Sequence, residues 1–216
     1  MRLRALALNI ARLGFAGTAI VAMTYQFAST ADSAFQKANF FSFFTIQSNV
    51  LAVASLCLLV VVRRAERTRL FDGARSGVVL YMAITGIVFA LLLSGLQEEL
   101  QTTIPWVDFV VHKLMPVVLV VDWLIDPPRH RLPLWAAAAW LAYPFSWFLY
   151  TLARGAAVDW YPYPFVDVGE LGYGSVLGRA SVLLVGFALA ALALLAIGNR
   201  LAHRASREGL LVPSSY

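Results

Sequence analysis

Apolar residues dominate six stretches of the chain, and polar or charged residues separate these stretches from one another. They lie at about residues 8–28, 40–62, 76–96, 105–125, 134–153 and 175–198. Each is close to the roughly 20 residues that a helix needs to cross a hydrocarbon core about 30 Å thick. Because backbone groups in lipid must find partners within their own segment, such stretches are expected to be helices. The pattern therefore predicts an all-α, polytopic membrane protein with six transmembrane helices in one domain, residues 1–216.

Prolines mark several of the expected helix ends. Pro105 and Pro133 stand where a first helical turn tolerates proline, and Asp126-Pro127-Pro128 ends the fourth stretch. The longest connection, residues 154–174, contains the run Trp160-Tyr161-Pro162-Tyr163-Pro164-Phe165. Aromatic residues gather where a protein passes the lipid headgroups. We predict that this segment is an outer loop that forms a lid over a cavity opening to the outer leaflet.

The composition excludes a soluble domain. Hydrophobic residues make up 60% of the 216 residues, and charged residues 13%, against roughly 25% charged residues in a typical soluble domain. So much apolar sequence also excludes an intrinsically disordered chain. The single cysteine, Cys57, excludes an internal disulfide and a cysteine-based metal cluster.

Arginines indicate the orientation of the helices. Most of the 17 lysines and arginines fall on one side of the alternating loops: Arg2, Arg4, Arg63, Arg64, Arg67, Arg69, Arg75, Arg129, Arg131, Arg200, Arg204 and Arg207. The positive-inside rule places that side, and both termini, in the cytoplasm. The net charge of +5 then reflects membrane topology, and we expect no nucleic-acid partner. Because Arg12 interrupts the first apolar stretch, we expect a retained helix there and not a cleaved signal peptide.

Ionisable residues inside the apolar stretches need partners, because a lone charge in hydrocarbon is costly. Arg12 and Asp122 lie at matching depths near the cytoplasmic side, which predicts a structural ion pair. Arg179 and Asp108 lie at comparable depths near the outer side. They form a second such pair, or Arg179 holds the carboxylate or phosphate of a ligand.

The stretch 105–125 carries a polar face. Asp108, His112 and Asp122 recur there at helical spacing together with Met115 and Leu119, so they share one side of the helix. Asp108 can hold the His112 imidazole across one helical turn. Pro116 follows, and it lacks the N–H that would bond to the carbonyl of residue 112, so we expect an opened or kinked helix at the histidine. His112 is then a base, or a buried histidine bonded to a neighbouring helix.

Thr45 is a candidate nucleophile on the second stretch. It shares a helix face with Ser48 and Asn49 and lies at about the depth of His112. A threonine hydroxyl attacks an ester only when a base takes its proton, and a histidine on a facing helix could do so. Ser48 or Asn49 could stabilise the oxyanion. The alternative is a structural threonine bonded to a carbonyl of its own helix.

Three runs resemble the bacterial Pr-six-Pr membrane proteins. They are Phe43-Phe44-Thr45-Ile46-Gln47-Ser48-Asn49, then His112-Lys113-Leu114-Met115-Pro116 with Asp122-Trp123, and Tyr161-Pro162-Tyr163-Pro164-Phe165 with Asp167. The resemblance covers nearly the whole chain. That family is distantly similar to the eukaryotic androgen-induced membrane proteins, which hydrolyse fatty acid esters of hydroxy fatty acids with an intramembrane threonine and histidine. The resemblance implies that Thr45 and His112 are the corresponding residues.

Together these patterns predict an intramembrane hydrolase of lipid esters. Thr45 would attack the carbonyl, with His112 as base and then acid, Asp108 orienting the histidine, and Ser48 or Asn49 supporting the oxyanion. The substrate would be a fatty-acyl ester of the membrane, bound with the help of Arg179, Tyr163 and Asp167, and neither a cofactor nor a metal is required.

Two alternatives stay open. One is a carrier with a proton or anion path through Asp108, His112, Arg179 and Asp122. Proline-broken helices at Pro116 and Pro144 favour it, and the lack of an inverted repeat speaks against it. The other is a structural membrane protein, whose polar residues only fix helix packing.

Overall fold

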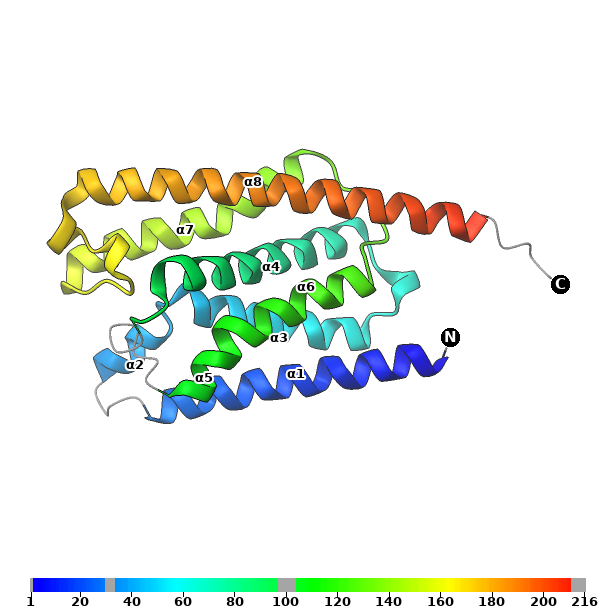
Figure 1. Cartoon of the computed structure of the whole chain (residues 1–216), viewed down its shortest axis with the longest axis horizontal. Coiled ribbons are helices and arrows are strands. Elements are labelled where there is room, and N and C mark those ends of the chain that lie inside the picture. Colours follow the sequence, from blue (N-terminus) through cyan, green and yellow to red (C-terminus); the bar gives the residue numbers. More distant parts are fainter. Residues whose placement is uncertain (1, 30–33, 97–103, 211–216) are drawn as a thin grey trace.

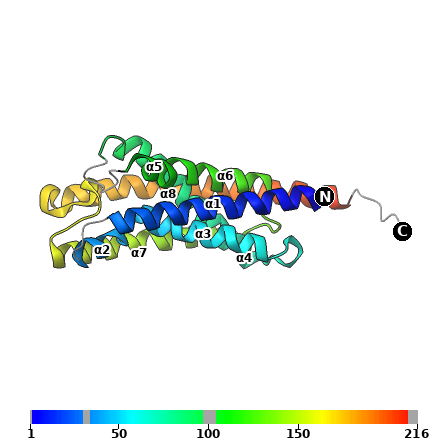
Figure 2. The same ribbon diagram turned by 90° about the horizontal axis from the view of Figure 1, so that it is seen from below.

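The computed structural model describes residues 2–29, 34–96 and 104–210, and within these ranges the chain forms helices and no strand. The all-helical prediction is confirmed, and four helices are long and apolar enough to cross a membrane, which is consistent with a membrane protein. They are α1 (Arg2–Ser29), α3 (Phe44–Val61), α4 (Arg69–Val88, continued by the π-helical turn η2, Phe89–Leu93) and α8 (Val168–Leu210). They lie side by side, and both termini are at the same end of the bundle (Figures 1 and 2).

Two further helical segments accompany these four. One is a continuous run made of α5 (Pro105–Phe109), the π-helical turn η3 (Val110–Leu114) and α6 (Met115–Ile125). The other is α7 (Trp135–Val158), which contains Pro144. Shorter elements complete the described chain: α2 (Ala34–Phe40) and the 3-10 turns η1 (Arg64–Glu66) and η4 (Pro164–Val166).

Helix α4 lies at the centre of the bundle. It packs against α3 and α6 on one side and against α7 and α8 on the other. Its core side chains Val79, Leu80 and Met82 are buried. Helix α1 covers α3 and the α5–α6 run, whereas α8 is the least buried of the four long helices. Large apolar side chains on the outer face of α8 are exposed, as expected where lipid is the solvent.

The connection between α7 and α8 is shorter than predicted. Helix α7 continues to Val158 because Ala156 and Ala157 favour a helix, and Asp159 ends it in the left-handed conformation with φ 52°. Helix α8 already starts at Val168 but is interrupted at Gly172, whose φ of 71° favours glycine. The non-α segment therefore covers residues 159–167, and not 154–174.

Pro116 has the local consequence that its missing N–H predicts. The turn directly before it is π-helical, and the N–H of Met115 bonds to the carbonyl of Val110. Pro116 itself is buried against Gly86 of α4, where an added Cβ would lie 3.0 Å from the proline ring. The proline thus loosens the helix at His112 and also permits close packing on α4.

Candidate functional site

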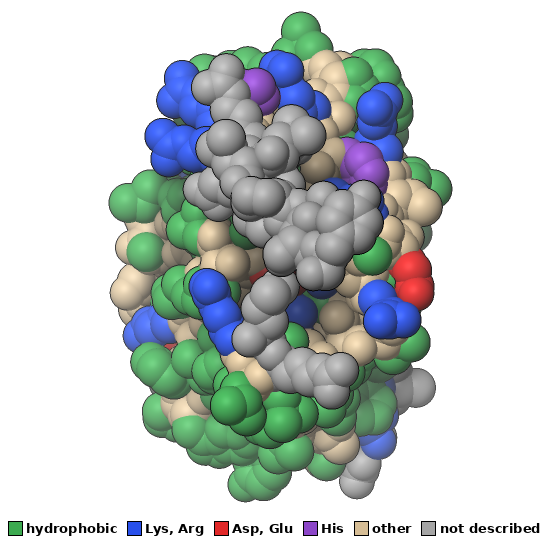
Figure 3. Space-filling view, turned by 90° about the vertical axis from the view of Figure 1, so that its right-hand side faces the viewer, with side chains coloured by type: hydrophobic (Ala, Val, Ile, Leu, Met, Phe, Trp, Pro, Cys, Tyr) green, Lys and Arg blue, Asp and Glu red, His purple; other side chains and the backbone are tan. Residues whose placement is uncertain are grey.

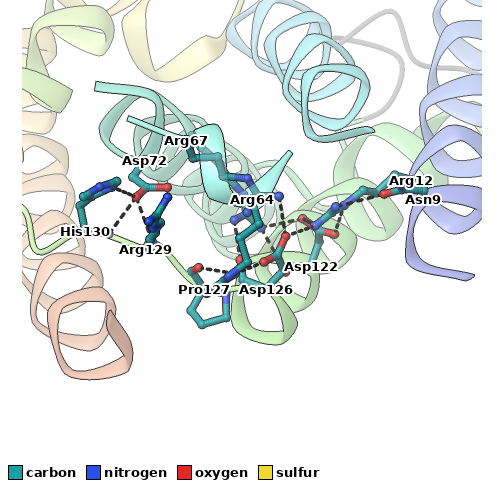
Figure 4. A network of polar contacts seen from close by, with 11 residues as sticks. Asn9, Arg12, Arg64, Arg67, Asp72, Asp122, Asp126, Pro127, Arg129 and His130 are labelled. Atoms are coloured by element: carbon teal, nitrogen blue, oxygen red, sulfur yellow. Dashed lines mark hydrogen bonds and ion pairs between the residues drawn. The ribbon is translucent and has the colours of Figure 1, made fainter. Parts of the chain in front are cut away.

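A network of buried ion pairs joins α1, α4 and α6 near the end of the bundle that holds both termini (Figure 4). The Arg12 guanidinium lies 2.7 Å from a carboxylate oxygen of Asp122 and 2.7 Å from one of Asp126. Arg75 lies 2.8 Å from the other oxygen of Asp122, and Arg67 lies 2.8 Å from Asp126. The structure thus brings Arg12 and Asp122 together and adds Asp126, Arg67 and Arg75, partners that their depths did not predict.

Two arginines, Arg75 and Arg64, also bind the end of α6. Arg75 donates hydrogen bonds to the backbone carbonyls of Asp122 and Asp126. Arg64 donates to the carboxylate of Asp126 and to the carbonyl of Pro127. The carbonyls of Asp126 and Pro127 follow the last helical turn, where carbonyl groups lack partners within the helix, and the helix dipole there attracts cations. The network therefore caps α6 as well as neutralising its carboxylates.

Asp126 is held in its ionised form. Burial alone would raise the pKa of its carboxyl, but hydrogen bonds from Arg67 and Arg12 outweigh burial, and the pKa lies below its ordinary value. Both carboxylates of the network are paired on both of their oxygens. The geometry is that of a structural centre in which arginines pair with every carboxylate oxygen, while Nε and one terminal nitrogen of Arg67 have no hydrogen-bond partner among the described residues.

Asp72 organises the connection between α6 and α7. This fully buried carboxylate accepts hydrogen bonds of 2.9 Å from the backbone N–H groups of Arg129 and His130. The same oxygen lies 2.8 Å from Nδ1 of His130 (Figure 4). Its partners belong to the connection itself. Among the described residues, no three His, Cys, Asp or Glu side chains lie close enough together to hold a metal ion.

Asp108 and His112 form a buried pair near the opposite end of the bundle. Nδ1 of His112 lies 2.9 Å from Asp108, across one turn of the α5–η3 run. The imidazole stacks on the ring of Phe89, with centroids 4.2 Å apart and planes at 12°. The ring of His112 is therefore oriented from two sides, as a base or a packed histidine would need.

Thr45 lies in the first turn of α3, next to Tyr163 of the 159–167 segment. Its hydroxyl and its backbone N–H both lie 3.3 Å from the phenol oxygen of Tyr163. The amide of Asn49 donates to the carbonyls of Thr45, at 2.9 Å, and Val111, at 3.1 Å. Both N–H groups of that amide are thus engaged, which leaves neither for an oxyanion. Ser48 is fully buried on the same helix.

Aromatic contacts fix the 159–167 segment over α3 and α7. Tyr163 is buried against Phe43 and Trp147, and stacks on Phe165 at 5.3 Å. Tyr161 lies against Gly155 of α7 so closely that an added Cβ would overlap its ring. These contacts hold the phenol oxygen of Tyr163 next to the hydroxyl of Thr45.

A cavity of about 260 Å³ lies between α4, α7, α8 and the start of α3. Its wall is mainly aliphatic and aromatic, and its polar members are Thr45, Thr85, Tyr163 and Ser181. Thr85 and Ser181 donate to carbonyls of their own helices. Thr45 and Tyr163 therefore supply the hydroxyl groups that bond to each other at the wall. Phe145, Leu177 and Leu184 line the cavity and are about half exposed, so it opens at the α7–α8 flank.

The structure does not bring Thr45 and His112 together. The hydroxyl of Thr45 faces Tyr163, whereas Nδ1 of His112 faces Asp108 and the ring lies on Phe89. Among the described residues no hydrogen bond joins the two side chains, and His112 is not part of the cavity wall. The physical reason is that Asp108 and Phe89 hold the imidazole, whereas Tyr163 holds the hydroxyl of Thr45.

The other candidate substrate contacts are also separate from the cavity, except for Tyr163. Arg179 is exposed on α8 and forms no ion pair with a described residue, because Asp108 binds His112 instead. Asp167 accepts the backbone N–H of Glu170 at 3.1 Å and so caps the first turn of α8. Neither side chain lines the cavity.

The sequence pattern missed the depth of the arginine network. The charge pattern places Arg67 and Arg75 in a cytoplasmic loop, yet both are buried. Asp126 ends the predicted fourth helix. Its spacing of four residues from Asp122 places both carboxylates on one helix face, and this signal could have indicated a shared site.

Comparisons with known proteins assign no family. No protein-family model, curated protein or solved structure matches the chain. The resemblance to the Pr-six-Pr membrane proteins therefore stays a prediction from its residue runs, and a function has to be argued from the geometry.

Proposed function

We propose that this chain is a multi-pass membrane protein that binds the acyl chain or a similar apolar part of a lipid. The ligand occupies the cavity between α4, α7 and α8. The single observation that carries this proposal is that open, largely apolar cavity inside a helix bundle. Ligand sites are typically concave, mostly apolar and equipped with a few convergent polar groups, and this cavity has those properties.

The proposed topology has six membrane crossings, with the α5–α6 run and α7 as the additional two. Both termini lie on the cytoplasmic side. Figure 3 views the end that holds the termini, where arginine side chains gather around the bundle. Exposed members of this group are Arg4, Arg63, Arg64, Arg69, Arg129, Arg131, Arg200 and Arg204. The positive-inside rule supports that orientation and a place in a cell membrane.

The cavity suits one slender apolar group. Its volume of about 260 Å³ lies just below the range of roughly 300–1,000 Å³ for drug-sized ligands, so a two-chain lipid would not be enclosed. The opening is flanked by Phe145, Leu177 and Leu184 on the exposed flank of α7 and α8. An acyl chain could therefore enter from the hydrocarbon without crossing water.

The Thr45–Tyr163 pair anchors the polar end of the ligand. One O–H proton lies between the two oxygens, and the proton of the other hydroxyl is available for an acceptor on the ligand. Burial raises the pKa of Tyr163, so the phenol is neutral and acts as a donor throughout the physiological range.

Ester hydrolysis by Thr45 is a second candidate, which the position of its hydroxyl on the cavity wall favours. It requires a base. The neutral phenol of Tyr163 is a poor base, and among the described residues no hydrogen bond joins His112 to Thr45. Binding without turnover is therefore the function that the geometry supports better.

Filling the cavity tests the binding proposal. Ala180→Trp places a large ring in the cavity, whereas Val182→Trp adds the same ring to the exposed face of the same helix. We expect lipid extracted from the purified protein, quantified by mass spectrometry per mole of protein, to fall severalfold in Ala180→Trp only. Equal lipid content in the parent and both variants would contradict the proposal.

Labelling with a fluorophosphonate separates binding from hydrolysis. The binding function predicts no labelling of the parent and no release of fatty acid from esters. Labelling that disappears in both Thr45→Ala and His112→Ala would establish the hydrolase instead, since each variant removes one partner of the expected pair.

A further inference from the structure

The cavity wall lacks charge. None of the lining residues that the structure describes is Lys, Arg, His, Asp or Glu. The nearest charged residues along the chain are Arg179, beside the lining residue Ala180, and Asp167, beside the lining residue Val166. Arg179 is exposed, and Asp167 is engaged with the N–H of Glu170. A charged ligand group in the cavity would therefore have no counter-ion.

Burying an ionised group without a partner is far more costly than burying a carbonyl that receives a hydrogen bond. The cavity has the second kind of partner, the hydroxyl pair of Thr45 and Tyr163. It also has a wide aromatic wall: Phe44, Phe145, Trp147, Phe148, Tyr163, Phe165 and Phe187. The wall therefore favours the binding of an apolar ligand with one neutral hydrogen-bond acceptor and disfavours the binding of a charged ligand.

We propose that the cavity selects lipids with an uncharged, oxygen-bearing head group, such as a neutral ester, and rejects anionic amphiphiles of the same chain length. This inference rests on the proposed function and adds the chemical class of the ligand. The acceptor oxygen bonds to Thr45 or Tyr163, and the chain extends between α7 and α8. Arg179 takes no part in binding.

Two brominated probes with one chain test this selectivity. Bromine quenches tryptophan fluorescence on contact, and Trp147 lines the cavity. The probes are the methyl ester of dibromostearic acid and dibromostearyl sulfate, which carries its negative charge at every working pH. Each is titrated into the whole protein in neutral detergent. The quenching of Trp147 is obtained by subtracting the quenching of Trp147→Phe from that of the parent. This subtraction removes the contribution of the other five tryptophans, including the exposed Trp106 and Trp135.

We expect half-maximal quenching of Trp147 by the ester at a concentration at least about tenfold lower than by the sulfate. Thr45→Val should weaken the ester several-fold, because it removes one hydroxyl of the pair without changing the side-chain shape. The matched control is Thr18→Val, whose hydroxyl bonds to Gly14 on the exposed face of α1. Arg179→Gln should leave both titrations unchanged.

Equal quenching by the two probes, or stronger quenching by the sulfate, would overturn the selectivity while leaving lipid binding intact. A sulfate signal that Arg179→Gln abolishes would also overturn it, by identifying an anion site. Quenching of Trp147 by neither probe would instead contradict the proposed function itself.

Discussion

The two buried polar regions of this protein use their side chains in opposite ways. In the arginine–aspartate network, guanidinium groups face both oxygens of Asp122 and of Asp126, and Arg75 also donates to backbone carbonyls at the end of α6. In the cavity, the wall carries hydroxyl groups but no charge, and space remains beside them. The carboxylates of the network are paired by its own arginines, whereas the cavity leaves space that the proposed lipid would fill.

The difference shows that a buried charge is weak support for a functional site in this bundle. A charge inside the membrane needs a partner, and in the network arginines occupy both oxygens of each carboxylate, which leaves neither carboxylate for a substrate. The two neutral hydroxyl groups of Thr45 and Tyr163 need no counter-ion, and one of their protons is available for an acceptor on a ligand. The charged residues that stand out in the sequence thus hold the helices together, and a threonine and a tyrosine line the proposed lipid site.

The largest effect is expected from breaking the network. Asp122→Asn leaves the buried Arg12 and Arg75 short of a carboxylate, which should lower the free energy of unfolding by about 3–5 kcal/mol. Thermal or denaturant unfolding in detergent, followed by circular dichroism, measures the loss. Asp159→Asn is the matched control, because Asp159 is exposed and its left-handed conformation suits asparagine; it should change stability by at most about 0.5 kcal/mol.

A second variant sharpens this test. Arg12→Met removes one cation, yet Asp122 keeps Arg75 and Asp126 keeps Arg67, so its loss should be smaller than that of Asp122→Asn. A loss equal to that of Asp122→Asn would show that Arg12 is the dominant partner, and that the network is a simple pair.

An intermediate effect is expected at the cavity. Gly155→Ala drives a methyl group into the ring of Tyr161, and overpacking of this kind lowers stability by about 1–3 kcal/mol. The displaced segment should also move Tyr163 away from Thr45 and weaken quenching of Trp147 by the brominated ester. Gly14→Ala, with open space at its Cβ, should leave both properties intact or gain slightly in stability. Normal ester binding in Gly155→Ala would show that ester binding does not depend on the position of Tyr163.

Much of the fold follows from local patterns. The stretch predicted at 105–125 is the α5–α6 run, because Pro105 can begin a helix and Asp126-Pro127-Pro128 cannot continue one. The contact between Asp108 and His112 follows from a spacing of four residues on one helix. Such features depend on one segment alone, so the sequence specifies them.

Contacts between segments were harder to foresee. Thr45 and His112 lie at similar depths in their predicted helices, but depth does not fix the rotation of each helix about its axis. In the structure, the ring of Phe89 at the end of α4 stacks on the histidine. The partner of Thr45 proved to be Tyr163, from a segment whose path depends on a close approach between Tyr161 and Gly155. Arg67 and Arg75 follow the same rule, since their burial depends on how the chain folds back over α6.

The smallest effect is expected from mild acid, and it tests whether the network holds its charge. The folded-state pKa of Asp126 lies below its ordinary value of about 4, so its stabilising effect is fully present above that value. The effect is lost only as the pH falls through the lower, folded-state pKa. The difference in unfolding free energy between the parent and Asp126→Asn should therefore change by less than about 0.5 kcal/mol from about pH 8 to about pH 5. A difference that shrinks within this range would mean that Asp126 takes up a proton there, and that its arginines do not outweigh burial.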